Sequence, residues 1–74
     1  MPKACILIKV VPPKAPNVLK QVKAIENVRK AYIAFGRWDI VAFLTVANYT
    51  QLKDITQKIN SLNGVRSTET LAEA

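Results

Sequence analysis

The chain has 74 residues, a net charge of +6 at neutral pH, one cysteine and no histidine. A chain of this length forms one domain that buries only about 60% of its unfolded surface, and a single cysteine excludes an internal disulfide. With no histidine, a structural metal centre is not indicated either, so association with other chains is the expected source of additional stability.

The composition also argues against several classes of protein. The eleven cations are dispersed, with no run of three and no interleaved aromatic residues, which predicts a solvated basic surface rather than a nucleic-acid-binding patch. The apolar run around Cys5 is too short for an export signal or a membrane anchor. A buried, reduced cysteine without a neighbouring base favours a cytoplasmic protein with no catalytic thiol.

The first half of the chain predicts a strand, a helix and a second strand. Residues Ala4 to Val11 form an apolar run that the two following prolines end. Pro16 suits the first turn of a helix, where its missing N–H needs no partner. The apolar residues that follow recur at helical spacing: Val18, Val22 and Ile25. A second strand is expected from Lys30 to Phe35.

The second half repeats this order. Residues Gly36 to Asp39 turn the chain into a third strand, from Ile40 to Ala47. Asn48 and Gln51 resemble a capping pair at the start of a second helix. The apolar stripe of that helix consists of Leu52, Ile55, Ile59 and Leu62. A last strand is expected from Val65 to Leu71.

The two halves match at an offset of 37 residues. The apolar helix positions coincide, Arg29 falls on Arg66, and Asn27 falls on Gly64. Asn and Gly most readily adopt the left-handed conformation that ends a helix, so both positions are expected to do so. A duplicated βαβ unit predicts an α+β, ferredoxin-like βαββαβ fold: a four-stranded antiparallel sheet with two helices on one face. Right-handed crossovers put the first and third strands at its centre.

Both central strands are apolar on both faces. In the first strand Ile6 and Ile8 point one way and Leu7 the other. In the third strand Val41 and Phe43 alternate with residues that are also apolar. Two helices cover only one face of the sheet, so the other would expose a large apolar patch. The sequence therefore predicts an obligate homodimer in which sheet packs on sheet, as a dimeric α/β sandwich or barrel.

Two motifs carry a resemblance to a known family. One is the Gly-x-aromatic-Asp turn at residues 36–39, and the other is the closing Gly-Val-x-x-Thr-x-Thr strand at residues 64–70. With the segments 4–10 and 28–32, they resemble the effector (RAM) domain of the Lrp/AsnC transcriptional regulators over essentially the whole chain. Full-length members also carry a helix-turn-helix domain. The 74 residues resemble a stand-alone effector domain over residues 1–74, so direct DNA binding is not expected.

The resemblance implies that a free amino acid binds near the turn, at interfaces between dimers. Gly36 lets the backbone approach closely, so that successive N–H groups cradle a carboxylate. Arg37 is expected to pair with that carboxylate and Asp39 to accept from the ammonium group. Trp38 is expected to form a wall of the site.

Thr68 and Thr70 are expected to supply hydroxyl groups to the same site. Side chains alternate along a strand, so these two threonines share a face and Glu69 points to the opposite one. The expected partners are a second copy, a higher ring of dimers, the free amino acid and a full-length member of the family. No cofactor, metal ion or membrane is expected.

Each of these residues also has a structural interpretation. Gly36 suits a hairpin turn, and Asp39 suits a bond to a backbone N–H in that turn. Trp38 suits an interface anchor, Arg37 a solvated turn, and the two threonines an ordinary strand.

Two other functions remain open at this stage. One is a small dimeric enzyme of the cofactorless oxygenase or isomerase type, for which Asp39 is the one candidate acid or base. The other is RNA binding on the sheet, which needs aromatic residues on the central strands, where Phe43 alone qualifies. The non-enzymatic amino-acid-binding module is the preferred hypothesis.

Overall fold

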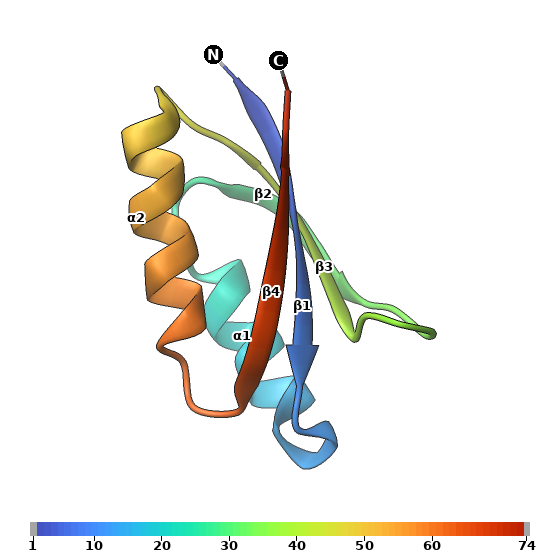
Figure 1. Cartoon of the computed structure of the whole chain (residues 1–74). Coiled ribbons are helices and arrows are strands. Elements are labelled where there is room, and N and C mark those ends of the chain that lie inside the picture. The colour runs from blue at the N-terminus through green and yellow to red at the C-terminus, as the bar shows by residue number, and fades with distance from the viewer. Residues whose placement is uncertain (1, 74) are drawn as a thin grey trace.

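A computed structural model describes residues 2–73, and the two end residues of the expected domain lie outside this range. The first half of the chain forms β1 (Lys3–Val10), a 3-10 turn (Pro12–Lys14), α1 (Ala15–Lys23) and β2 (Val28–Ile33). The second half forms β3 (Ile40–Thr45), α2 (Tyr49–Asn60) and β4 (Val65–Ala72). This is the predicted βαββαβ order (Figure 1).

The four strands form one antiparallel sheet in the order β2-β3-β1-β4. β1 and β3 lie at its centre, as predicted. Both helices lie on the same side of the sheet (Figure 1). The ferredoxin-like fold is therefore confirmed. The longer helix, α2, has 12 residues, and no helix in the described range is long and apolar enough to cross a membrane.

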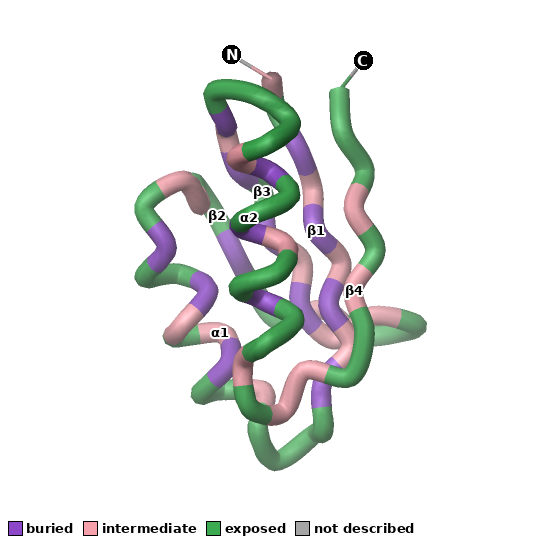
Figure 2. The backbone as a smooth tube through the Cα atoms, turned by 60° about the vertical axis from the view of Figure 1, so that its left-hand side comes forward, coloured by how far each residue is buried: buried purple, intermediate pink, exposed green. Residues whose placement is uncertain are grey.

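The hydrophobic core lies between the helices and one face of the sheet. Buried and less buried residues alternate along β1 and β3, and the buried positions of α1 and α2 face them (Figure 2). The largest fully buried side chains are Ile6, Ile8, Ile40, Leu44 and Ile59. Within residues 2–73 this core holds no polar side chain, so its stability comes from burying aliphatic surface.

Two predicted strand boundaries were wrong. β2 spans Val28–Ile33 rather than residues 30–35, because the chain leaves the sheet before Phe35, whose side chain is 99% exposed. β3 ends at Thr45 rather than at residue 47, because the chain turns there into the cap of α2. That cap is as predicted: the Asn48 side chain accepts from the backbone N–H of Gln51 at 2.9 Å.

The internal repeat includes a β-bulge at the same position in each half of the chain. In β2, Val28 pairs with Leu44 and Lys30 with Phe43, which leaves Arg29 as an extra, bulged residue. In β4, Arg66 is left over in the same way, because the pairing with β1 shifts register next to it. The two arginines that match in sequence therefore both stand at a β-bulge, at the second residue of the strand that follows the helix of their half.

The residues that end the helices behave differently in the two halves. Gly64 has a φ of +103°, and its carbonyl accepts from the Val11 N–H at 2.8 Å. Asn27 does not adopt a positive φ, so this expectation was wrong. Instead, Asn27 bonds Thr45 twice: its carbonyl accepts from the Thr45 N–H, and its side-chain amide donates to the Thr45 carbonyl, each at 3.1 Å. A pair of hydrogen bonds thus takes the place of the left-handed turn.

Gly64 has no room for a side chain. A Cβ at this position would lie 2.5 Å from Lys14 Cβ, whereas a Cβ on Gly36 would meet nothing within 4 Å. We expect Gly64→Ala to lower the free energy of unfolding by about 2–4 kcal/mol, through left-handed strain and overlap together. Gly36→Ala should lower it by about 1–2 kcal/mol through strain alone.

Urea denaturation of both variants, followed by far-UV circular dichroism at one protein concentration, measures this difference. Equal losses for the two variants would contradict a role for the close contact with Lys14.

Candidate functional site

The turn between β2 and β3 lies at the tip of a hairpin that extends past the sheet, away from both helices (Figure 1). Gly36 has a φ of +134°, so glycine is needed here for the backbone conformation and not for space. Phe35 and Arg37 beside it are exposed, and Trp38 is half-buried. The predicted turn residues therefore face solvent on this protomer.

Asp39 fastens the turn to the central strand β1. Its backbone N–H donates to the Ile8 carbonyl at 2.9 Å, and its Oδ2 accepts from the Val10 N–H at 3.0 Å. Pairing between β1 and β3 ends at Ile8 and Ile40, so Val10 has no backbone acceptor on that side. The carboxylate supplies this acceptor. Asp39 therefore accepts from a backbone N–H, but this N–H belongs to β1 and not, as the structural interpretation had it, to the turn.

Lys9 adds a second connection between β1 and the turn. Its Nζ donates to the Arg37 carbonyl at 3.1 Å and lies 3.7 Å from Asp39 Oδ2. Both charged groups are partly exposed, so the ion pair contributes less than about 1 kcal/mol. The sequence contained no signal for Lys9, because its contact depends on how β1 and β3 align.

Several polar groups of the turn make no bond within residues 2–73. They are the backbone N–H groups of Gly36, Arg37 and Trp38, the Arg37 guanidinium and the second carboxylate oxygen of Asp39. Four consecutive residues thus offer donors and a cation for a carboxylate, and an acceptor for an ammonium group. These are the two charged groups of a free amino acid.

Thr68 and Thr70 are separated from β3 and the turn by the strand β1. They pair with Ile8 and Ile6 and therefore share the helix-covered face of the sheet. The Thr68 hydroxyl donates to Asn60 Oδ1 of α2 at 3.0 Å, and the Thr70 hydroxyl lies 3.4 Å from that of Thr56.

β1 lies between β4 and β3, and the two threonine side chains are held on the helix-covered face. The structure therefore does not bring these threonines to the turn of their own protomer. Glu69 lies on the open face beside Leu7, opposite to the threonines as predicted.

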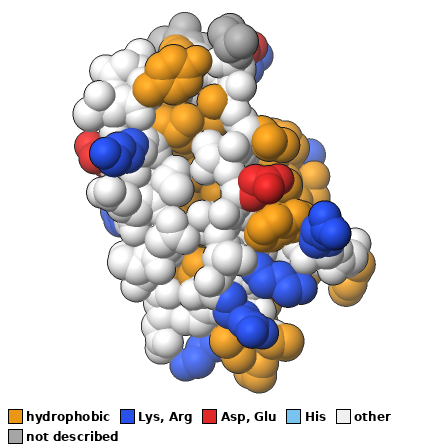
Figure 3. Space-filling model, viewed as in Figure 1, with side chains coloured by type: hydrophobic (Ala, Val, Ile, Leu, Met, Phe, Trp, Pro, Cys, Tyr) orange, Lys and Arg blue, Asp and Glu red, His pale blue; other side chains and the backbone are white. Residues whose placement is uncertain are grey.

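The open face of the sheet is apolar at its centre. Leu7 pairs with Val41, and Cys5 with Phe43, whose side chain is 41% exposed. Tyr32 and Leu71 extend this surface onto the two edge strands. Hydrophobic side chains gather along the side of the molecule away from the helices (Figure 3). The prediction that both faces of the central strands are apolar is confirmed.

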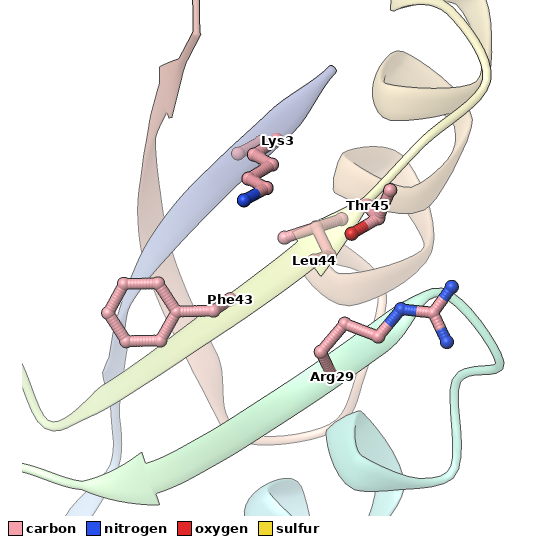
Figure 4. A pocket seen from close by; sticks show the side chains of 6 residues that line it. Lys3, Arg29, Phe43, Leu44 and Thr45 are labelled. Carbon is pink, nitrogen blue, oxygen red and sulfur yellow. The ribbon is translucent and has the colours of Figure 1, made fainter. Parts of the chain in front are cut away.

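A hollow of about 270 Å³ lies at the end of this face opposite to the turn. The side chains of Lys3, Arg29, Phe43 and Thr45 surround it, with Ala4 and Leu44 also contributing (Figure 4). Neither cation has a carboxylate within 4 Å among the described residues. No pattern in the sequence indicated this hollow, because the bulge that sets the position of Arg29 is a consequence of strand pairing.

The described residues offer little for metal or thiol chemistry. No three His, Cys, Asp or Glu side chains within residues 2–73 lie close enough together to hold a metal ion. Burial raises the pKa of the Cys5 thiol above its ordinary value, so the thiol is protonated at neutral pH. A protonated thiol on an apolar sheet face is not a nucleophile.

The turn groups hydrogen-bond donors, a cation and a carboxylate oxygen, which are the chemical groups of a site for a small charged ligand. The fold is common to many unrelated proteins and does not identify the family by itself. A comparison with family models does so: the Lrp/AsnC ligand binding domain matches residues 3–72. The chain belongs to this family, whose members are effector-binding regulatory modules.

Solved structures agree with this assignment. TTHA0845 from Thermus thermophilus is 31% identical, with a TM-score of 0.95 over 100% of this chain and 94% of that chain. FFRP-DM1 is 25% identical, with a TM-score of 0.92 over 100% of both chains.

The feast or famine regulatory protein from M. tuberculosis, complexed with L-methionine, is 27% identical. Its TM-score is 0.77, over 99% of this chain and 50% of that chain. No curated protein matches the chain.

The bond between Asp39 and Val10 has a measurable effect on stability. We expect Asp39→Ala to lower the free energy of unfolding by about 1–2 kcal/mol, because the Val10 N–H loses its acceptor. Asp39→Asn retains an oxygen acceptor and should lose less than half as much. Lys9→Gln removes the ion pair and the exposed bond from Nζ to the Arg37 carbonyl, and it should stay within about 0.5 kcal/mol of the parent. Equal losses for the two Asp39 variants, measured in urea, would show that charge matters more than the hydrogen bond.

Proposed function

We propose that this chain binds a free amino acid at the Gly36–Asp39 turn and that binding modulates a transcriptional regulator. The observation that carries the proposal is the set of free N–H donors, cation and carboxylate oxygen within one exposed turn. Membership of the Lrp/AsnC family supports an effector, and the L-methionine complex of the M. tuberculosis relative supports an amino acid as its class.

In this proposal the ligand carboxylate accepts from the N–H groups of residues 36–38 and pairs with Arg37. The ligand ammonium donates to the free carboxylate oxygen of Asp39, whose other oxygen stays on Val10. Trp38 contacts the variable side chain. Since Asp39 is already held by β1, the site is preorganised and loses little entropy on binding.

Thr68 and Thr70 take part in this proposal only through a neighbouring copy. Their hydroxyl groups contact α2 within their own protomer, and β1 separates their strand from β3 and the turn. A ring of dimers, or co-assembly with a full-length family member, would supply such a neighbour. This agrees with a site located between dimers.

Trp38 is the only tryptophan in the sequence, so its fluorescence reports on the proposed site directly. Titration with each of the twenty amino acids should change this fluorescence and raise the melting temperature for one or a few of them. A ligand at a hundred times its Kd stabilises the folded state by about 2.7 kcal/mol per site, which a thermal scan resolves. No response to any amino acid would contradict the proposed ligand class.

Arg37→Ala tests most directly whether the ligand binds at this turn. The Arg37 side chain makes no bond within residues 2–73, so the ligand-free stability should stay within about 0.5 kcal/mol of the parent. The response to the ligand should disappear. Arg66→Ala removes the same charge at another exposed position and should keep the response. Loss of the response in both variants would indicate a general charge effect instead of a site.

The second part of the proposal is a homodimer that joins the open faces of two sheets. The molecule measures 34 × 21 × 18 Å. A stable interface buries roughly 800 Å² of accessible surface per partner. Leu7, Val41 and Phe43 at the centre of the open face supply the apolar surface that such an interface needs.

We expect Val41→Lys to make the protein monomeric at concentrations where the parent is a dimer, because it buries a charge at the centre of the interface. Val41 pairs directly with Leu7 and Tyr32, so both cross-strand neighbours of the new charge are uncharged. Gln57→Lys, on the exposed side of α2, adds the same charge and should stay dimeric. Sedimentation equilibrium distinguishes the two, and a parent that sediments as a monomer would refute the dimer.

A further inference from the structure

The most exposed hydrophobic side chain of the described chain is at the tip of the β2–β3 hairpin. Phe35 is 99% exposed, whereas the other exposed large hydrophobic residues lie between 39% and 57%. The hairpin tip extends from the sheet on the side away from the helices (Figure 1). A second copy on the open face would therefore meet this ring, which has no packing partner in its own chain.

The hollow described above is the counterpart on the same face. It is lined by the Phe43 ring and by the cations of Lys3 and Arg29, and it measures about 270 Å³. A cavity of about 150 Å³ is enough to hold a benzene ring. The side chain of Phe35 therefore fits, with the two cations available to its π face.

A protomer cannot fill its own hollow. The turn stands at the start of β3 and the hollow at its end, roughly 20 Å away at the usual rise per strand residue. Consider a twofold axis that lies between two facing sheets, parallel to both and perpendicular to their strands. This axis reverses the strand direction of the partner sheet. The turn of each protomer then lies over the hollow of its partner, and both contacts form at once.

We propose that Phe35 of each protomer docks in the partner's hollow, and so fixes the orientation of the homodimer. This inference rests on the proposed dimer. A twofold axis along the strands would instead bring the two Arg37 side chains together and leave both Phe35 rings in water. Glu73, whose carboxylate accepts from the Lys3 N–H, lies beside the hollow and offers Arg37 an opposite charge.

Docking also ties the proposed ligand site to the dimer. Phe35 directly precedes Gly36, so a docked ring holds the first residue of the turn against the partner. Residues at the rim of the partner's hollow then lie next to the free N–H groups of the turn. The dimer therefore fixes the position of the turn from which the ligand site is built.

Crosslinking tests the orientation while Phe35 stays in place. In a Cys5→Ala background, Arg37→Cys combined with Thr45→Cys puts one thiol on the tip and one at the rim of the hollow. A short bismaleimide cannot join the two within one chain, given their separation along β3. We expect a covalent dimer on a denaturing gel. Arg37→Cys combined with Gln57→Cys, which lies on the helix side, should give none.

Sedimentation of the same samples separates the two proposals. A monomer refutes the homodimer itself. A dimer that crosslinks through residues 37 and 45 supports the docking of Phe35. A dimer that fails to crosslink, or that crosslinks equally in the control, overturns the docking and leaves the homodimer standing.

Binding measurements provide an independent test. Phe35→Ala should raise the dimer Kd about tenfold or more, since buried aromatic anchors dominate interface energies. Phe35→Tyr keeps the ring and should stay within a few-fold of the parent. An unchanged Kd for Phe35→Ala would overturn the inference.

Discussion

The structure depends on one geometric constraint: two helices cover one face of a four-stranded sheet whose central strands are apolar on both faces. On the covered face, Ile6, Ile8 and Ile40 are fully buried and form the core with the helices. On the other face, Leu7 is half-buried and Phe43 exposed, because both helices lie on the opposite side of the sheet. One chain therefore buries only the helix-covered face of its central strands. The proposed dimer would bury the other face.

Asp39 belongs both to the proposed binding turn and to the contacts that hold the sheet together. Asp39 uses one carboxylate oxygen and its own N–H to hold β1, where the pairing with β3 has ended. The second oxygen is free within the described residues. A rigidly held carboxylate next to free backbone donors is a better binding group than one on a mobile loop, because less freedom is lost when a ligand arrives. The structural and the ligand-binding interpretations of Asp39 are therefore compatible.

The sequence predicted the contiguous parts of the candidate site and none of those that depend on pairing. The turn residues follow one another in the chain, so local chemistry was enough to single them out. Thr68 and Thr70 share a face, as their spacing requires, but the register with β1 turns that face towards α2. Lys9 at the turn and Arg29 at the hollow carried no signal, because an alignment of strands and a bulge set their positions.

The sequence by itself determined the order of the elements, the repeat, the central position of β1 and β3, and the apolar character of both sheet faces. Hydrophobic periodicity and turn residues act over a few neighbours, so they can be read along the chain. Tertiary structure decided that the chain leaves the sheet before Phe35 and which side chains surround the hollow. It also decided that Asn27 bonds Thr45 instead of adopting a left-handed conformation. These features depend on strand register and bulges, which are fixed only when residues far apart in the sequence pair and pack together.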